Sequence, residues 1–294
     1  LFDEPPNPLW LRLLRLLSFV VFLGPLRMAV FGVSCVVLWG LLGVGPLVRR
    51  VFGSEREWGE AMYRVCRPVL RLALLALGVV RVEVRGKPDG RRRIVVSNHL
   101  SVLDAAVGMC TSPVSFMAAA NLESNPVIRN AGRVFGMVYV DREKKEGVTD
   151  RIRAAGRGER TWPLWIFPEG KVTAGDCLLG FRTGAFVEDC VVQPVAIRWK
   201  HWLCPRGMTT ISWLSNCLPF YVYQLFCTPF YTAEINYLES VELKRGKQTP
   251  EESAVSIQLQ IANFLGTPAI KQTNRELFSK KSTIRSRCDA CLRN

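Results

Sequence analysis

Histidine is almost absent from this chain, which holds only His99 and His201 among its 294 residues. Zinc-finger sites need several histidines or cysteines at short spacing, and the ten cysteines offer a single close pair, Cys288 and Cys291. We therefore expect no metal site. Acidic residues are also few, with 25 against 39 lysines and arginines and a formal net charge of +14. The basic residues are not interleaved with base-stacking aromatics and form no RNP pattern, which excludes nucleic acid as the expected partner.

Apolar residues accompany this charge, since they make up 49% of the chain and the mean hydropathy is +0.13. A chain that combines apolar bulk with positive charge is typical of a protein at an anionic membrane surface, where each nearby lysine or arginine contributes about 1 kcal/mol. The cysteines are scattered through apolar stretches rather than clustered. This distribution is typical of a reduced, cytosol-facing protein without disulfides.

The first fifty residues carry the longest apolar runs. Met28 to Val48 is an uncharged run about as long as a helix that spans a bilayer. Leu9 to Leu23 is shorter, and Gly24-Pro25 separates the two runs. Basic residues flank the outer ends of this region at Arg12, Arg15, Arg49 and Arg50. Since positive charge favours the cytosolic side, residues 1–50 are predicted to form a membrane-embedded hairpin, with a single span as the alternative.

Three further regions follow along the chain. Residues 51–80 fit either an interfacial amphipathic helix or a helix that packs on the core and exposes a basic face. Residues 81–268 alternate short apolar runs with helical patterns, which predicts an α/β domain whose sheet is flanked by helices. Within it, Thr249 to Glu252 predicts a helix start with a capping box. Residues 269–294 are expected to form a basic tail.

The elements of the α/β domain can be placed from these patterns. Six stretches are predicted as strands: Val82 to Val84, Ile94 to Val96, Val114 to Met117, Met137 to Val140, Leu164 to Phe167 and Val191 to Ile197. Three stretches between them are predicted as helices: Val102 to Cys110, Asn125 to Ala131 and Lys144 to Arg157. The aromatic stretch from Thr210 to Leu238 fits either a strand pair or an interfacial patch.

His99 follows the predicted strand Ile94 to Val96, and Asp104 comes five positions later. An imidazole accepts a proton near neutral pH, and a carboxylate on its other nitrogen stabilises the imidazolium that forms. Residues five apart on one helix point about 140° away from each other, so the two can pair only across a loop. We predict that Ser101 caps a helix with Asp104 in its first turn, which leaves Asn98 and His99 in the loop. A histidine satisfied by backbone groups is the alternative.

Three later stretches carry residues suited to a ligand. Phe167-Pro168-Glu169-Gly170 and the following Lys171-Val172-Thr173 come directly after a predicted strand, where α/β sheets place their sites, and Gly170 permits close approach. The stretch Gly136 to Arg142 places the guanidinium of Arg142, a good phosphate ligand, at the end of a predicted strand. The alternative for Phe167 to Gly170 is an ordinary turn, and the alternative for Arg142 is a surface ion pair. Val192-Gln193-Pro194-Val195 places a proline in a strand, which indicates an edge strand or a bulge.

These stretches, in this order, resemble the motif series of the glycerophospholipid acyltransferase superfamily, the PlsC-like or 1-acylglycerol-phosphate acyltransferases. Asn98 to Asp104 matches the NHxSxxD motif, and the matches to the later blocks are Gly136 to Arg142, Phe167 to Gly170, Phe181 to Phe186 and Val192 to Val195. The resemblance covers about residues 80–200. The chain is most similar to the ancient ubiquitous protein group, through the N-terminal hairpin and Pro219 to Gln224, with lysophosphatidylcholine acyltransferases as near neighbours.

The resemblance implies a PlsC-like α/β fold and transfer of an acyl group from acyl-CoA to a hydroxyl of a lysophospholipid or glycerol phosphate. His99 would act as general base and Asp104 as its orienting partner, with acyl-CoA as co-substrate and no other cofactor. The residues implied for substrate binding are Asn98, Ser101, Arg142, Glu169, Gly170, Lys171 and Thr173. Arg142 and Lys171 would hold the acceptor's phosphate, and Glu169 would hold one of them or an acceptor hydroxyl.

The same resemblance implies a place on the endoplasmic reticulum membrane and lipid droplets, facing the cytosol. Membrane lipids are then expected partners, and ubiquitin-pathway proteins are partners by resemblance alone. A non-catalytic scaffold in protein degradation, built on an acyltransferase-like fold, is the alternative function.

Two departures from the pattern concern the phosphate ligands: Lys171-Val172-Thr173 stands where Thr-Arg-Ser is frequent, and Ala118 to Asn121 lacks a basic residue that is often present.

Overall fold

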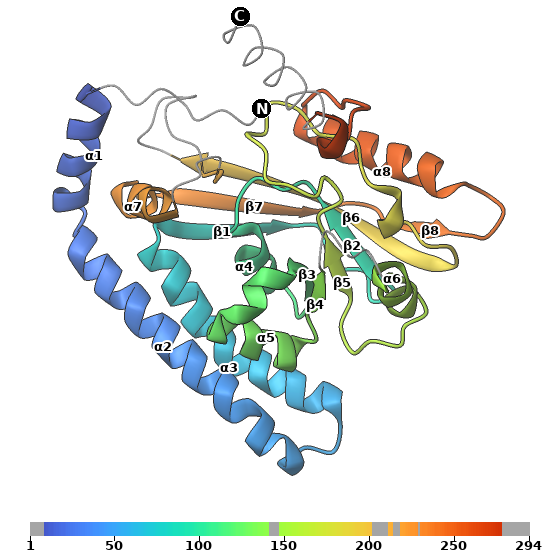
Figure 1. Cartoon of the computed structure of the whole chain (residues 1–294), viewed down its shortest axis with the longest axis horizontal. Helices are drawn as coiled ribbons and strands as arrows, with labels where there is room; N and C mark the ends of the chain where they lie inside the picture. Colours follow the sequence, from blue (N-terminus) through green and yellow to red (C-terminus); the bar gives the residue numbers. More distant parts are fainter. Residues whose placement is uncertain (1–8, 141–146, 202–210, 214–217, 229, 278–294) are drawn as a thin grey trace, which may run out of the picture.

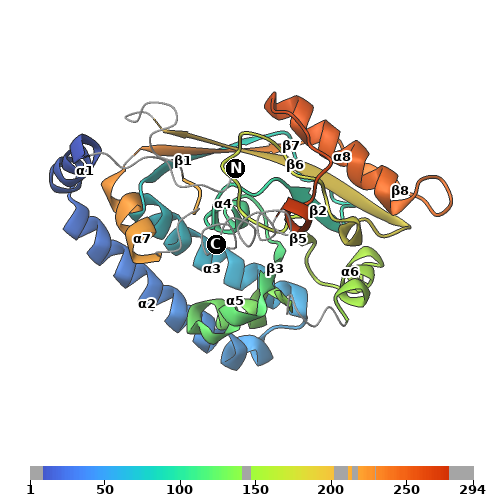
Figure 2. The ribbon, with the colours of Figure 1, turned by 45° about the horizontal axis from the view of Figure 1, so that its top comes forward.

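A computed structural model gives the fold of residues 9–140, 147–201, 211–213, 218–228 and 230–277. Its centre is an eight-stranded mixed sheet in the order β1-β7-β6-β2-β5-β3-β4, with β8 paired to β6. Helices cover both faces of the sheet, and the N-terminal helices lie outside one of these layers (Figure 1). The same layers are visible in the turned view (Figure 2). The α/β fold class predicted from the sequence is confirmed.

The six predicted strands and three predicted helices of the domain are all present, with ends shifted by up to four residues, and the structure adds one helix and two strands in residues 218–243. The strands are β1 (Val79–Arg85), β2 (Ile94–Ser97), β3 (Ser115–Ala119), β4 (Val138–Val140), β5 (Leu164–Ile166), β6 (Cys190–His201), β7 (Tyr231–Tyr237) and β8 (Val241–Leu243). The α-helices are α1 (Leu9–Val21), α2 (Gly24–Val48), α3 (Glu55–Ala76), α4 (Asp104–Met109), α5 (Pro126–Phe135), α6 (Val148–Gly156), α7 (Leu218–Cys227) and α8 (Pro250–Leu265). Short 3-10 turns are Arg49–Val51, Ala120–Ser124 and Thr183–Ala185.

Strand β2 shows why the sheet is covered on both faces. Ile94 and Val96 face the layer that contains α6 and α8, whereas Val95 faces the layer that contains α3, α4 and α7. Alternate residues of a strand point to opposite faces, so an uninterrupted apolar run is buried only between two layers. The run Ile94 to Val96 is completely buried, which puts β2 at the centre of the domain.

The strand order brings two loops together. β5 and β6 both pair with β2 in parallel, with Ser97 opposite Val195. The chain therefore leaves β2 and β5 at the same edge of the sheet, where the loop 98–103 meets the loop 167–173. β6 continues past this edge to His201, so its last residues lie beside the first loop.

Pro194 lies in the middle of the sheet, and the prediction that it marks an edge strand or a bulge is wrong. β6 changes its antiparallel partner at this point, from β8 opposite Cys190–Val192 to β7 opposite Val195–His201. The Pro194 carbonyl accepts from the Leu238 N–H at 2.9 Å, so the proline nitrogen points to the side where the partner changes. A missing N–H breaks no ladder hydrogen bond there, which is why an inner strand tolerates the ring.

The N-terminal region forms two helices, α1 and α2, that meet at a bend at Phe22 and Leu23 (Figure 1). The predicted hairpin is thus a bent pair of helices rather than two antiparallel arms. α2 packs on α3 and α5 through Leu38 and Leu42 and exposes much of its remaining surface. In the described part of the chain, Gly24–Val51 is the one helix long and apolar enough to cross a membrane, by length and composition.

α3 combines the two arrangements predicted for residues 51–80. Its buried residues Trp58 and Met62 pack against α2 and α5, as in a core helix. Its outer face exposes the apolar residues Val65, Leu72 and Leu75, as in an interfacial helix. The helix therefore belongs to the packed domain and contributes apolar surface outside it.

Two arginines of the N-terminal helices are structural. Arg15, predicted as a flanking charge, is instead buried where α1 meets α7, with its guanidinium 5.9 Å from the centre of the Phe220 ring. Arg27 donates to carbonyl groups at the ends of α3 and α7: Ala76 at 2.9 Å, Phe226 at 2.8 Å and Leu225 at 3.3 Å. A cation complements the negative end of both helix dipoles. Arg27 thus joins the N-terminal helices to the domain.

Two predictions for the second half of the chain are corrected. The described part of Thr210 to Leu238 is one helix, α7, followed by one strand, β7, instead of a strand pair or a patch. The start of the predicted tail is packed, because the Ile270 N–H donates to the Leu178 carbonyl at 3.0 Å. Residues 278–294, with Cys288 and Cys291, lie outside the described residues. The six cysteines within the described ranges are free thiols.

The role of Arg27 predicts a loss of stability on substitution. Arg27→Met removes three hydrogen bonds from a charged donor and is expected to lower the free energy of unfolding by about 2 kcal/mol. Arg50→Met, at an exposed position of the turn after α2, is the matched control and should change it by less than about 0.5 kcal/mol. Chemical denaturation in detergent micelles measures both. Equal stabilities of the two variants would contradict this role.

Candidate active site

His99 and Asp104 lie in contact across the loop between β2 and α4, as the sequence predicts. The Nδ1 atom of His99 is 2.9 Å from the Oδ2 atom of Asp104. The Asp104 side chain is 0% exposed and that of His99 is 19% exposed. Among the described residues, none forms a hydrogen bond with Nε2 of His99. A sealed carboxylate therefore orients an imidazole whose second nitrogen can take a proton.

Ser101 does not cap the helix, and this prediction is wrong. α4 begins at Asp104, and the Ser101 hydroxyl accepts from the Leu103 N–H at 3.1 Å inside the loop. Asp104 closes the turn instead, because its Oδ2 accepts from the N–H groups of Leu100 at 2.7 Å and Ser101 at 2.8 Å. A carboxylate is a stronger acceptor than a hydroxyl. Ser101 is completely buried, 3.3 Å from the Tyr221 hydroxyl, and so is not open to a substrate.

Trp199 is a contact of the site that the sequence analysis missed. Its indole N–H donates to Oδ1 of Asp104 at 2.8 Å. The two residues are 95 positions apart, so no local spacing signals their contact. Trp199 lies on the part of β6 that extends beyond the end of β2.

Asn98 holds the loop rather than a substrate, which corrects its predicted role. Its Nδ2 donates to the Ile197 carbonyl at 2.9 Å, and the Ile197 N–H donates to its Oδ1 at 2.8 Å. The amide group therefore imitates a further backbone pair between β2 and β6. Because the side chain is buried, it is satisfied by the strand and closed to solvent.

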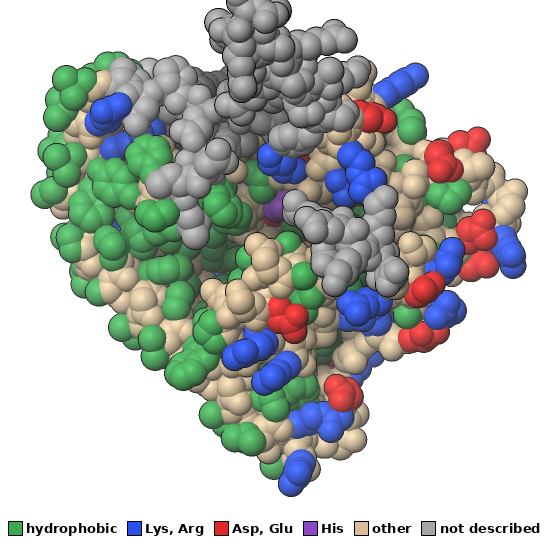
Figure 3. Space-filling view, viewed as in Figure 1, with side chains coloured by type: hydrophobic (Ala, Val, Ile, Leu, Met, Phe, Trp, Pro, Cys, Tyr) green, Lys and Arg blue, Asp and Glu red, His purple; other side chains and the backbone are tan. Residues whose placement is uncertain are grey.

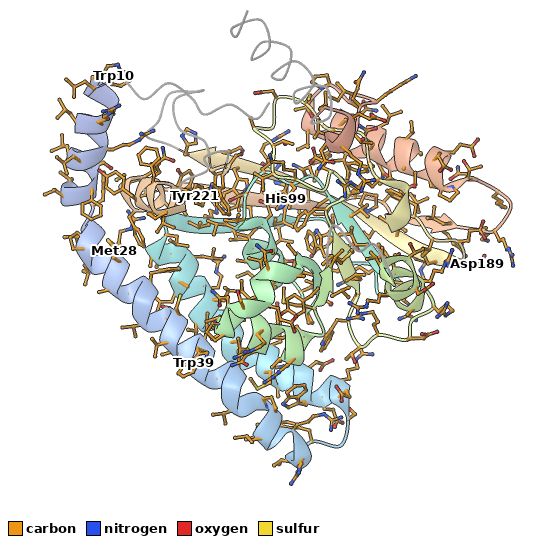
Figure 4. All side chains as sticks on the ribbon, in the orientation of Figure 1. Trp10, Met28, Trp39, His99, Asp189 and Tyr221 are labelled. Carbon is orange, nitrogen blue, oxygen red and sulfur yellow. The ribbon has the colours of Figure 1, made fainter. Side chains whose placement is uncertain are left out.

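The His99 ring is confined from one side by an aromatic stack. The ring centres of His99 and Phe167 are 4.0 Å apart with 15° between their planes, and Phe167 stacks in turn on Phe116 at 6.0 Å. Figure 4 labels His99 near the centre of the molecule. In the same view, Figure 3 shows a histidine in a hollow between an apolar area and lysine or arginine side chains. The imidazole therefore meets solvent where apolar and basic surfaces adjoin.

Glu169 supports the loop from inside, where backbone amides contact both of its carboxylate oxygens, and Arg142, one of the cations predicted as its partner, lies outside the described residues. Oε1 accepts from the His99 N–H at 2.8 Å, and Oε2 accepts from the Leu179 N–H at 3.1 Å. The side chain is completely buried. Burial raises the pKa of Glu169 to about 8, and it outweighs the two amide hydrogen bonds, which lower that pKa. Glu169 is thus a positioning group of the His99 backbone.

Gly170 adopts a φ of +71°, which glycine reaches without strain. The close approach predicted for a ligand is made by the chain itself, because a Cβ at this position would lie 2.8 Å from Cζ of Arg182. Arg182 also donates to Oδ1 of Asn274 at 2.6 Å. It lies in the motif stretch Phe181 to Phe186 but was not predicted as a site residue. The structure places its exposed positive charge beside the loop 167–173.

The remaining predicted residues have three different outcomes. The Thr173 N–H donates to the His99 carbonyl at 3.0 Å. The hydroxyl oxygen of Thr173 is buried without a hydrogen-bond partner in the described part of the chain. Lys171 is half-buried in the same loop. Arg142 lies outside the described residues. The structure therefore brings Lys171 and Thr173 into the loop beside His99 and leaves Arg142 unplaced.

The arrangement suits removal of a proton from a neutral hydroxyl group. An imidazole held by a carboxylate can accept that proton and later return it to a leaving group. The rigid support of His99 keeps its free nitrogen at one place, with Phe167 on one ring face and Glu169 on the backbone. Such pre-organisation is what a general base requires.

Comparisons with known proteins find acyltransferases among the proteins that this chain is similar to. Residues 81–198 match the family model described as Acyltransferase. The chain is 31% identical over 169 residues to lysophospholipid acyltransferase LPEAT1 of Arabidopsis thaliana, covering 55% of this chain and 40% of the relative. It is 24% identical over 294 residues to lysophosphatidylcholine acyltransferase 1 of Homo sapiens, covering 92% and 52%. It is 29% identical over 191 residues to the lipid droplet-regulating VLDL assembly factor AUP1 homolog of Caenorhabditis elegans, covering 63% and 46%.

The chain thus spans about half the length of the curated relatives it matches. The crystal structure of the 1-acyl-sn-glycerophosphate acyltransferase PlsC from Thermotoga maritima superposes with a TM-score of 0.57 at 18% identity, covering 83% of this chain and 97% of that one. This likeness shows a common fold. The matched segment 81–198 contains the loops of His99 and Glu169. Residues 81–198 of this chain thus match the Acyltransferase family model, and lysophospholipid and lysophosphatidylcholine acyltransferases are among the proteins that the chain is similar to.

Proposed function

We propose that the chain is a membrane-bound enzyme that moves an acyl group from acyl-CoA to a hydroxyl of a lysophospholipid or glycerol phosphate. The observation that carries this proposal is the 2.9 Å contact between His99 Nδ1 and Asp104 Oδ2, with the carboxylate sealed and the imidazole open to the hollow. The names of the relatives support the acceptor class, since they include acyltransferases of lysophospholipids and lysophosphatidylcholine.

In the proposed reaction, Nε2 of His99 takes the proton of the acceptor hydroxyl as its oxygen attacks the thioester carbonyl carbon. The new carbon–oxygen bond forms, the carbon–sulfur bond breaks, and the imidazolium returns the proton to the leaving sulfur of coenzyme A. Asp104 stabilises the imidazolium between these two transfers. The acceptor's phosphate would lie near Lys171 and Arg182, the cations of the loop 167–173 and its neighbour.

The N-terminal helices supply the membrane contact in this proposal. α1 and α2 expose many large apolar side chains, among them the labelled residues Trp10, Met28 and Trp39 (Figure 4). α3 packs along α2 and carries exposed charges in its first turns, among them Glu57. Charged side chains are unfavourable in the hydrocarbon core of a bilayer. We therefore place the outward face of α2 in one leaflet rather than the whole helix across the bilayer. Both acyl chains could then reach the hollow without crossing water.

One comparison favours a second function. The similarity to the lipid droplet-regulating VLDL assembly factor AUP1 homolog supports a role at lipid droplets. The second proposal is a non-catalytic scaffold there, for which the family resemblance implies the endoplasmic reticulum and ubiquitin-pathway partners. The intact contact of His99 and Asp104 favours the enzyme, because a scaffold has no need of an oriented base. Full replacement of the wild-type chain by His99→Ala in cells would favour the scaffold.

The enzyme proposal predicts a large loss of transfer on removal of the base. His99→Ala removes the proton acceptor and is expected to reduce the rate about 10²–10⁴-fold. Asp104→Asn removes the charge partner of the imidazole and is expected to reduce the rate at least about tenfold. The assay uses purified chain in mixed micelles, labelled acyl-CoA and a panel of lysophospholipids and glycerol phosphate. His201→Ala, the other histidine, is the control. Wild-type transfer no greater than that of His99→Ala would refute the proposal.

The raised pKa of Glu169 predicts a pH dependence of stability. The buried carboxyl keeps its proton up to a pKa of about 8, whereas the unfolded chain loses it near 4.5. Unfolding therefore releases a proton between these values, and the free energy of unfolding falls as pH rises through this window and levels off above about 8. Glu169→Gln removes this slope, although it leaves one amide without an acceptor and is less stable at low pH. Denaturation at pH 5.5 and 8.5 measures the slope. The exposed Glu251→Gln is the control, and an unchanged slope in Glu169→Gln would contradict the assignment.

The membrane contact predicts the effect of charges on α2. Val36 and Trp39 lie one helical turn apart and are 65% and 50% exposed. Changing both to glutamate is expected to weaken binding to phosphatidylcholine vesicles at least about a hundredfold, because each large apolar side chain contributes about 1.5–3 kcal/mol on burial. Vesicle flotation measures the bound fraction. The control pair Val255→Glu and Leu259→Glu on exposed α8 should bind as wild type, and equal loss in both pairs would contradict the contact.

A further inference from the structure

The Asp104 carboxylate accepts four hydrogen bonds from two parts of the chain, the loop before it and β6. Oδ2 accepts from two loop amides and faces His99 Nδ1 at 2.9 Å. Oδ1 accepts from the indole N–H of Trp199 at 2.8 Å. The contacts of Oδ2 come from the residues just before Asp104 in the sequence, whereas the contact of Oδ1 comes from β6. The two oxygens are therefore held by different elements.

The indole of Trp199 is itself held in place by the sheet. Trp199 pairs with Ala233 across β6 and β7, and its ring meets the Tyr231 ring edge-on, with centres 6.4 Å apart and 90° between the planes. The side chain packs against the larger of the two cores that flank the sheet. Two residues earlier on the same strand, the Ile197 backbone binds the Asn98 amide. β6 thus holds the connection between β2 and α4 at two points, the Asn98 amide and the Asp104 carboxylate.

From these contacts we infer that Trp199 is a positioning residue of the site, whose indole N–H fixes the Asp104 carboxylate so that Oδ2 points to His99. An indole nitrogen can donate a hydrogen bond but cannot accept one, and it carries no proton that is exchanged with imidazole. It therefore fixes the carboxylate without competing for the proton of the reaction. No hydrogen bond or ring contact of the described residues joins Trp199 to His99, so Trp199 acts on the imidazole through Asp104.

Loss of this donor would leave a buried carboxylate oxygen without its hydrogen bond. The oxygen is sealed from solvent, and a charged acceptor in that state rotates toward another donor or admits water. Either change turns Oδ2 away from His99 Nδ1. The imidazole would then lose its orientation while the acyl and acceptor contacts stayed as they were.

The experiment compares Trp199→Phe with Trp213→Phe. Trp213 is a matched control, because its indole nitrogen is buried but has no hydrogen-bond partner in the described part of the chain. The kinetic arm rests on the proposed function and uses labelled acyl-CoA with lysophosphatidylcholine. We expect Trp199→Phe to lower kcat about tenfold to a hundredfold with both KM values within about twofold, and Trp213→Phe to keep kcat within about twofold. Unchanged kcat in folded Trp199→Phe overturns the inference.

A second arm needs no substrate and so separates this inference from the proposed function. The chain has two histidines, so protein labelled with ¹⁵N-histidine gives two sets of imidazole resonances, and His201→Gln assigns them. Trp199→Phe should shift the ring nitrogen resonances of His99, and Trp213→Phe should leave them in place. A role confined to packing would lower the unfolding temperature of Trp199→Phe without moving the His99 resonances, which would overturn the inference.

A variant of the partner residue covers the case in which Trp199→Phe does not fold. Asp104→Asn replaces the charged acceptor by a neutral group of the same shape. Among the eight indole N–H resonances of protein labelled with ¹⁵N-tryptophan, one should then move upfield, because Trp199 loses its charged acceptor. Spectra in which none of the eight resonances moves would overturn the inference.

Discussion

The buried carboxylate of Asp104 is the group on which the arrangement of the site depends. A carboxylate removed from water needs donors on both oxygens, and here they are two loop amides, an imidazole and an indole. The imidazole and the two amides lie in the loop just before Asp104, whereas the indole reaches Oδ1 only because β6 lies beside β2 and runs past its end. The order of the strands therefore decides whether the second oxygen of Asp104 has a donor.

Several motif residues hold the loops instead of a ligand. Asn98 pairs with β6, the Ser101 hydroxyl accepts from the Leu103 N–H inside the loop, and Glu169 accepts from two backbone amides. Each is buried, because a loop at the sheet edge has backbone groups that the ladder no longer satisfies. Fixed side chains take over where the ladder ends. A short motif around a base can thus be specific because it encodes the support of that base, even where few of its residues are open to a substrate.

The N-terminal helices are joined to the domain by a polar contact inside an apolar region. Arg27 reaches carbonyl groups at the ends of α3 and α7, where both helix dipoles favour a cation. The same helices leave a large apolar surface outside this contact. An arginine that a hydropathy pattern counts as an interruption is therefore a link between two layers. By joining these helices to the domain, Arg27 also holds the apolar surface beside the hollow of His99, and both are visible in Figure 3.

The sequence by itself located most elements of the α/β domain and the contact of His99 with Asp104. Short apolar runs and helical patterns located the strands and helices around β2, and the capping box at Thr249 located the start of α8, because these signals depend on neighbours in the chain. The spacing of His99 and Asp104 required a loop, and the structure has one. Only the tertiary structure decided the partners of Asp104, Glu169 and Gly170 and the central place of Pro194. Those contacts join residues that are far apart along the chain, such as Trp199 and Asp104, and strand order, which no local pattern encodes, brings them together.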